Sequence, residues 1–97
     1  MKLIWTEAAL DDLSQQLEYV ADDNPSAATR LETEIERQVD LLEEHPEIGR
    51  PGRVVGTREL VIARTPYVAI YRLRKNVVEI LQLLHGAQEW PVRVRRP

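Results

Sequence analysis

The stretch that decides the fold is "TPYVAIYRLRKNVVEILQLLHG", residues 65–86. It contains two runs that are rich in β-branched and aromatic residues, 67–74 and 77–84, which is a composition typical of strands. Lys75-Asn76 fits a two-residue hairpin loop between them, because asparagine tolerates a positive φ angle. The second run is apolar at both parities, so we expect it to be a central strand that is covered on both faces.

The segments on either side extend this sheet. Residues 58–63 ("RELVIA") predict a third strand, joined to the hairpin by a turn at 64–66. Residues 45–53 ("HPEIGRPGR") hold two prolines and two glycines and predict an irregular connection. The short apolar run at 2–5 predicts a strand that adds at an edge of the sheet.

Residues 6–44 predict two helices. Thr6 can cap the first helix, and Pro25 ends it because proline disfavours helix in the preceding residue. Pro25 is then suited to be the first residue of the second helix, capped by Asp23 or Asn24. The expected apolar stripes are Leu10, Leu13, Leu17 and Val20, and then Ala28, Leu31, Ile35, Val39 and Leu42. The predicted fold is α+β with the order βααβββ, in which a two-helix hairpin packs on one face of a small twisted antiparallel sheet.

A chain of 97 residues is long enough for one domain. We expect it to comprise a strand plus an acidic helical hairpin (1–49), a basic sheet (50–91) and a basic tail (92–97). The first part carries 3 Lys/Arg and 13 Asp/Glu, and residues 50–97 carry 10 Lys/Arg and 3 Asp/Glu. Such asymmetry indicates an anionic partner for the basic half, mutual attraction of the two halves, or two solvated faces.

Several classes of protein are excluded. There is no cysteine, and His45 and His85 do not have the spacing of a zinc site. No phosphate-binding loop or nucleophile elbow is present, so neither a metal nor a cofactor is expected. The chain has no stretch long enough to span a membrane, and its first residues lack the apolar core of a signal peptide. We therefore expect a cytoplasmic protein with no membrane partner.

His85 is the residue best suited to chemistry. Cleavage of RNA through the ribose 2′-hydroxyl needs a base, an acid and a cation, which His85, a tyrosine and an arginine could supply. The alternative is a strand-end histidine that is hydrogen-bonded to backbone, and the sequence alone favours it. Tyr67 and Tyr71 share one side of their strand, where they could stack on bases or lie buried with paired hydroxyls.

The arginines suggest a binding surface, because the guanidinium fork suits phosphate or carboxylate. Arg72 and Arg74 share one side of their strand, and Trp90 is expected to dock the tail onto the domain. The alternative is that these charges protect the sheet edges from association. The residues expected to contact a target or a protein partner are Arg53, Arg58, Arg64, Arg72, Arg74, Tyr71, Trp90, Arg93, Arg95 and Arg96.

The chain resembles the RelE/ParE superfamily of toxins from type II toxin–antitoxin systems over nearly its whole length. The resemblance lies in "WTEAALDDLSQQLEYVADDNPSAATRL" (5–31), "LLEEHPEIGRPGRVVGTRELVI" (41–62) and "TPYVAIYRL…VVEILQLLHGAQEWP" (65–91). It implies two helices on a small antiparallel sheet. It also implies a bacterial toxin that arrests growth unless a cognate antitoxin covers it in a hetero-oligomer.

The resemblance leaves the target open. ParE-like members inhibit DNA gyrase, whereas RelE-like members cut mRNA in the ribosomal A site. RelE-like nucleases carry one arginine just after the tyrosine of one strand and another just after the last strand. At the first of these positions this chain has Val68, and near the second, at 85–87, it has no arginine. Gyrase is therefore the favoured target, and cleavage of ribosome-bound mRNA is the alternative. The catalytic set of that alternative is His85, Arg64, Tyr67 and Glu59. A third possibility is a non-toxic member that binds its antitoxin and stabilises a plasmid.

Overall fold

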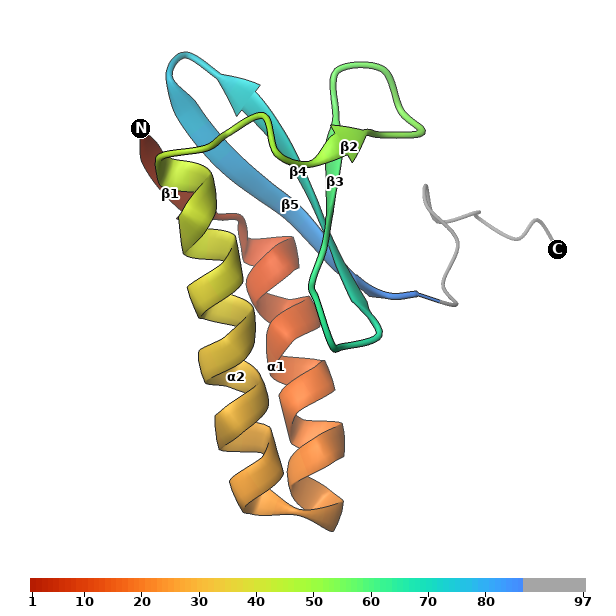
Figure 1. Ribbon diagram of the computed structural model, residues 1–97. Helices are drawn as coiled ribbons and strands as arrows, with labels where there is room; N and C mark the ends of the chain where they lie inside the picture. Colours follow the sequence, from red (N-terminus) through yellow and green to blue (C-terminus); the bar gives the residue numbers. More distant parts are fainter. Residues whose placement is uncertain (87–97) are drawn as a thin grey trace, which may run out of the picture.

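The computed structural model describes residues 1–86, in which two antiparallel helices cover one side of a five-stranded sheet (Figure 1). The expected docking of Trp90, and the predicted contacts of Arg93, Arg95 and Arg96, lie outside the described residues. The elements are β1 (Lys2–Trp5), α1 (Glu7–Asp23), α2 (Pro25–Asp40), the 3₁₀ helix η1 (Leu41–Glu43), β2 (Arg50–Pro51), β3 (Arg58–Val61), β4 (Tyr67–Arg74) and β5 (Val77–His85). The predicted α+β fold is confirmed.

The strand order is β1-β5-β4-β3-β2. The antiparallel meander of β3, β4 and β5 is confirmed, and β1 occupies an edge as expected. The prediction of a wholly antiparallel sheet is wrong, because β1 runs parallel to β5. A parallel pair needs a long crossover connection. The helical hairpin and the β2–β4 strands together provide it.

The irregular segment 45–53 contains a strand that the sequence does not predict. Strand β2 is two residues long and pairs with β3 through Arg50↔Glu59 and Pro51↔Arg58. Proline is tolerated there because β2 is the last strand of the sheet, where its missing N–H breaks no ladder. The element order is therefore βααββββ, with η1 between the helices and the sheet.

The predicted hairpin loop is confirmed at the backbone. Lys75 and Asn76 have φ angles of 51° and 63°, which suits a tight two-residue turn between right-twisted strands. Strand β5 lies between β1 and β4, as expected for its apolar sequence. A register irregularity lies at Ile70/Tyr71, where β5 contributes one extra residue.

The helix caps follow the sequence closely. The Thr6 Oγ1 accepts from the Ala9 N–H at 3.2 Å, and the Asn24 Oδ1 accepts from the Ala27 N–H at 3.1 Å. Asn24 is thus the cap of α2, with Pro25 as its first residue. One stripe residue is wrongly predicted, since Leu10 is 48% exposed. The buried side of α1 runs through Ala9 and Leu13, and Leu10 lies about 100° around the helix from Ala9.

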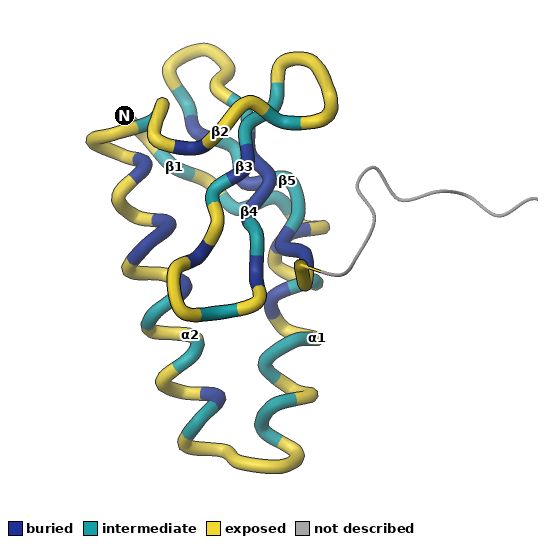
Figure 2. The backbone as a smooth tube through the Cα atoms, turned by 45° about the vertical axis from the view of Figure 1, so that its right-hand side comes forward, coloured by how far each residue is buried: buried dark blue, intermediate teal, exposed yellow. Residues whose placement is uncertain are grey.

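The core lies between the helices and the sheet, where the buried positions of both layers face one another (Figure 2). Cross-strand partners share a face, so Tyr67, Ala69 and Tyr71 of β4 point to the helices, and the alternate residues point away. We call the side turned away from the helices the outer face. Its residues include Arg50, Glu59, Val61, Val68, Ile70, Arg72, Arg74 and Glu79.

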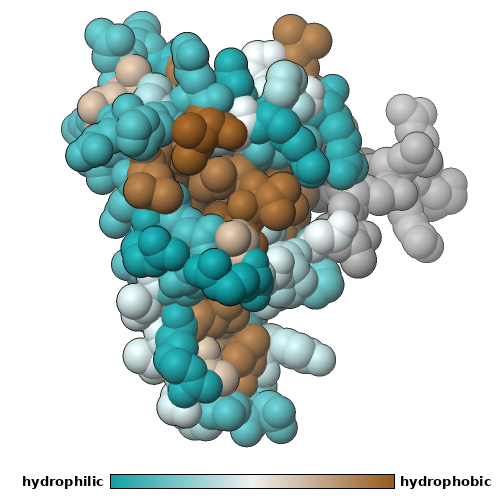
Figure 3. Space-filling view, in the orientation of Figure 1, coloured by the Kyte–Doolittle hydropathy of each residue, from teal (hydrophilic) through white to brown (hydrophobic). Residues whose placement is uncertain are grey.

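The surface seen in the orientation of Figure 1 is largely hydrophilic, with apolar side chains gathered in the middle of the view (Figure 3). Leu41 and Ile48 are among the large apolar residues that stay about half exposed. No helix within residues 1–86 has the length and apolar character needed to cross a membrane.

Candidate functional site

The outer face carries a buried carboxylate. Glu59 of β3 is 3% exposed, and its Oε1 accepts from Arg50 Nε at 3.0 Å and from Arg50 Nη2 at 2.9 Å. Its Oε2 accepts from the Arg53 backbone N–H at 3.2 Å and lies 3.7 Å from Arg53 Nε. A buried carboxylate needs such donors to offset its lost hydration. Both oxygens of Glu59 thus hold the β2–β3 connection in place.

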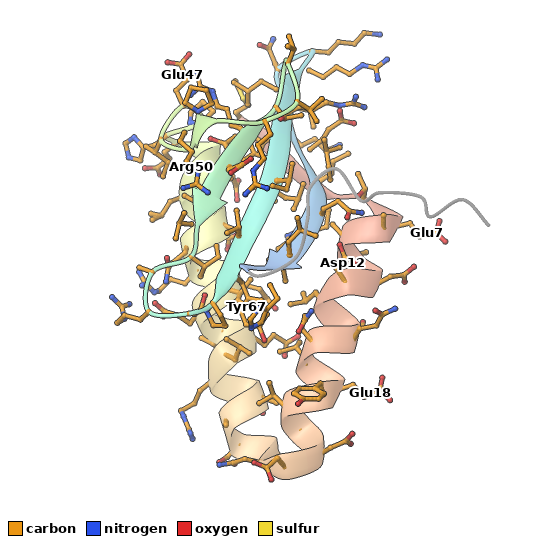
Figure 4. The ribbon with its side chains drawn as sticks, turned by 90° about the vertical axis from the view of Figure 1, so that its right-hand side faces the viewer. Glu7, Asp12, Glu18, Glu47, Arg50 and Tyr67 are labelled. Carbon is orange, nitrogen blue, oxygen red and sulfur yellow. The ribbon has the colours of Figure 1, made fainter. Side chains whose placement is uncertain are left out.

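A second group of charges lies further along the same face. Arg72 Nε donates to Glu79 Oε1 at 2.6 Å across the β4–β5 ladder. Arg74 follows two residues later on the same side and makes no ion pair with another described residue. In Figure 4, β3 and β4 lie in front of α2, and Arg50 lies beside the upper half of β3. Arg53, Arg72 and Arg74 are the predicted binding residues that the structure gathers here.

Two other predicted binding residues serve the fold instead. Arg58 lies on the helix side of β3, and its Nη1 donates to the Gly49 carbonyl at 2.8 Å. Tyr71 is fully buried, donates its hydroxyl to the Pro46 carbonyl at 2.8 Å and accepts from the Gly49 N–H at 2.9 Å. Burial raises the pKa of the Tyr71 phenol above its usual value. The pair fixes the segment between η1 and β2 from inside the molecule, so Tyr71 presents no surface to a partner.

Arg64 lies at the turn between β3 and β4 in the left-handed region, with φ 64°. Its Nη2 donates to Glu34 Oε1 of α2 at 2.6 Å. Glu34 also accepts from Arg37 and Gln38, and these hydrogen bonds, that of Arg37 first, lower its pKa to about 2. The Arg64 guanidinium is thereby tied to α2 rather than presented with the other candidate catalytic groups.

Tyr67 and His85 are brought together as register partners at the end of the β4–β5 ladder. Their rings meet edge to face, with centroids 5.8 Å apart and an interplanar angle of 87°. Burial raises the pKa of the Tyr67 phenol. Tyr67 belongs to the helix side of the sheet, because it is part of the core, whereas His85 is exposed and also lines the hollow beside Glu59.

The four candidate catalytic residues are therefore only partly brought together, because Arg64 and Tyr67 both lie apart from Glu59. Glu59 pairs with Ile70 in the ladder, and Ile70 lies three residues from Tyr67, which puts Glu59 and Tyr67 on opposite faces. Glu59 and His85 both line a small hollow between the strands, but its volume is ≈10 Å³. That space holds about one water molecule and admits no nucleotide.

Three residues with defined roles at the sheet were missed from the sequence. Arg50 is the principal partner of Glu59, and Gln38 of α2 bonds both backbone groups of Ala63. Asp12 of α1 accepts from the Leu83 N–H of β5 at 2.9 Å, and its pKa is raised, mainly by burial. Each contact joins segments that are far apart in the sequence, and no local pattern reports such pairs.

Other parts of the described chain offer little chemistry. Within residues 1–86, no three His, Cys, Asp or Glu side chains are grouped so that they could hold a metal ion. An open hollow of ≈610 Å³ lies at the tip of the helical hairpin, lined by Tyr19, Val20, Asp22, Asp23, Asn24 and Ala27. Its acidic lining disfavours phosphate, so it does not extend the arginine surface of the sheet.

Comparison with known proteins gives a consistent result. A family model described as the ParE toxin of the type II toxin–antitoxin system parDE matches residues 3–90. A solved structure from the chromosomal ParDE toxin–antitoxin system of P. aeruginosa superposes with a TM-score of 0.81 at 30% sequence identity. The superposition covers 88% of this chain and 95% of that one.

Two curated proteins are similar over nearly their full lengths. The candidate toxin Y4kP of Sinorhizobium fredii (strain NBRC 101917 / NGR234) is 44% identical over 90 residues, which cover 93% of each chain. Toxin RelE2 of Caulobacter vibrioides (strain ATCC 19089 / CIP 103742 / CB 15) is 34% identical over 87 residues. That match covers 90% of this chain and 97% of the relative.

Proposed function

The chain belongs to the ParE toxin family of type II toxin–antitoxin systems, and from this premise we propose that it arrests growth by binding and inhibiting DNA gyrase. A cognate antitoxin neutralises it in the cytoplasm by forming a hetero-oligomer. The antitoxin part of the proposal is supported by the similar P. aeruginosa structure, which comes from a ParDE system.

The dispersal of the candidate nuclease residues carries the proposal of inhibition by binding. Phosphoryl transfer requires a base, an acid and a cation arranged around one phosphate. Here Glu59 is buried under two arginines on the outer face, and Arg64 is bound to Glu34 of α2. Tyr67 lies on the helix side of the sheet, and the hollow that His85 shares with Glu59 is too small for a nucleotide. Inhibition of gyrase by binding needs no such constellation.

One observation favours the alternative, an endonuclease that cuts mRNA on the ribosome. Tyr67 and His85 are in ring contact at the end of the sheet, so a phenol and an imidazole that could serve as acid and base lie side by side. The chain is also similar to a protein named toxin RelE2. In this alternative Tyr67 and His85 would act on RNA held by the ribosome.

Two assays run in parallel separate these functions. Purified chain is added to a gyrase supercoiling reaction and to a reconstituted translation reaction in which transcripts are mapped by primer extension. The proposal expects loss of supercoiling and intact transcripts. Cut transcripts with normal supercoiling would replace it by the nuclease alternative. A chain inert in both assays would instead support the third possibility, an antitoxin-binding protein that stabilises a plasmid.

A further inference from the structure

The arrangement around Glu59 leaves two guanidinium groups fixed in position and open to solvent. Arg50 and Arg53 are 55% and 58% exposed, whereas the carboxylate that they share is 3% exposed. Two positive charges against one negative charge leave the group with one unbalanced positive charge. Because Glu59 already holds both side chains, less side-chain entropy is lost when a ligand binds them.

The same ratio of two arginines to one carboxylate recurs on the neighbouring strands β4 and β5. Arg72 is held by Glu79, and Arg74 lies on the same side without an ion pair to any residue of the described chain. Arg72 follows Ile70, the ladder partner of Glu59, by two residues, which separates the two groups by about 7 Å along β4. We call the two groups, Arg50/Arg53/Glu59 and Arg72/Arg74/Glu79, the twin arginine pairs.

The outer face continues from these pairs into apolar surface. Val61 of β3 is 50% exposed and pairs with Val68 of β4, two residues beyond Glu59 and Ile70 in the ladder. One end of the outer face thus offers two sites for anions, and the other offers an apolar contact. A ligand that matches both ends carries carboxylates at one end and an aliphatic side chain at the other.

A protein segment fits this surface better than a nucleic acid does. A nucleic acid presents closely spaced phosphates along its length and binds best to continuous positive surface. Here each arginine pair retains a carboxylate, the apolar end has no charge for a phosphate, and residues 1–49 carry a formal charge of −10. A segment with a few carboxylates carries less negative charge and is repelled less, and its aliphatic side chains gain from the apolar end of the face.

We propose that the twin arginine pairs bind an acidic, aliphatic segment of the antitoxin, and that Glu59 is the residue that positions Arg50 and Arg53 to receive it. This inference rests on the proposed antitoxin partner but does not depend on whether gyrase or mRNA is the target. The segment places carboxylates on the two pairs and an aliphatic side chain on Val61.

The test measures binding of fluorescein-labelled peptides to the full chain by anisotropy. The probe is a short peptide with glutamates in its first half and valines in its second half, so that an extended chain presents both kinds of side chain on one side. A peptide with glutamine in place of glutamate, and a single-stranded oligonucleotide of equal length, serve as comparisons. We expect the acidic peptide to bind about tenfold more tightly than the glutamine peptide, and more tightly than the oligonucleotide.

Three variants locate the site. Glu59→Gln removes the charge that holds Arg50 and Arg53 and raises the net positive charge of the group, so weaker binding would show that positioning matters more than charge. Arg74→Glu changes a residue that has no ion pair in the described chain. Each should weaken binding of the acidic peptide about tenfold. Arg30→Glu on α2 makes the same charge change as Arg74→Glu away from the sheet and should leave binding unchanged. If Glu59→Gln does not fold, peptide binding by Arg74→Glu still decides whether the inference holds.

The inference is overturned by tighter binding of the oligonucleotide, or by equal effects of Arg74→Glu and Arg30→Glu. Failure of the gyrase proposal would appear in the supercoiling assay and not here. A chain that inhibits gyrase but binds both peptides equally would retain the proposed function and lose this inference alone.

Discussion

Gln38 of α2 pairs with Ala63 as a neighbouring strand would. Its Nε2 donates to the Ala63 carbonyl at 3.1 Å, and its Oε1 accepts from the Ala63 N–H at 2.7 Å. Ala63 lies just beyond the end of β3. The two-residue strand β2 pairs only with Arg58 and Glu59 and does not extend as far as Ala63. The helix thereby satisfies a backbone edge that would otherwise be open to pairing with another chain.

Replacing this amide should destabilise the protein. We expect Gln38→Leu to lower the free energy of unfolding by about 2 kcal/mol, because both backbone groups of Ala63 lose their partner. Urea unfolding followed by circular dichroism measures the effect. Gln15→Leu, an exposed position on α1, is the matched control and should change stability little. Equal stability of the two variants would contradict the role of Gln38.

Removing the Tyr71 hydroxyl should loosen the segment that leads into β2. We expect Tyr71→Phe to cost about 1–3 kcal/mol, since the partly buried Pro46 carbonyl and the buried Gly49 N–H lose hydrogen bonds while the ring stays in place. Amide hydrogen exchange at Gly49 should speed up more than exchange in β4. Tyr19→Phe is the control, because Tyr19 is 79% exposed, and it should behave like the unaltered chain.

A third prediction concerns the stability of the fold at acidic pH. The Glu34 pKa is lowered to about 2 in the folded chain from an ordinary value of 4.5, chiefly by the hydrogen bond from Arg37. A lowered pKa stabilises the fold fully above the unfolded value, and that stabilisation is lost as the pH falls from 4.5 towards 2. The stability difference between the unaltered chain and Glu34→Gln should therefore be constant near neutral pH.

The stability difference between the unaltered chain and Glu34→Gln should shrink as the pH falls from 4.5 towards 2. Chemical unfolding at a series of pH values measures it, with Glu32→Gln on the exposed side of α2 as the control. A difference that stays constant down to pH 2 would show that Glu34 does not titrate with the fold.

The last prediction separates binding from catalysis in cells. We expect the double variant His85→Ala/Arg64→Ala to arrest growth about as strongly as the unaltered chain, because inhibition by binding uses neither group as a catalyst. Viable counts after induction measure it, and thermal unfolding checks that the variant is folded. Viable counts at least about a hundredfold higher with a folded variant than with the unaltered chain would point to RNA cleavage instead.

The sequence by itself determined both helices and every strand except the two-residue β2. The apolar runs, the caps at Thr6 and Asn24 and the loop at Lys75-Asn76 each act within a few residues, and all of them are found where the pattern predicts. Periodicity also identified most of the core, although it assigned Leu10 to the buried side when Ala9 and Leu13 define it.

Only the tertiary structure decided how the charged groups are used. Residue types predicted arginines able to bind an anion, but the choice among them depends on partners distant in sequence, such as Glu34 for Arg64 and Glu59 for Arg50. The parallel β1–β5 pairing and the separation of Glu59 from Tyr67 likewise arise from strand order and register. Ion pairs and register are contacts across space, and one chain read along its length carries no signal of which distant residues will meet.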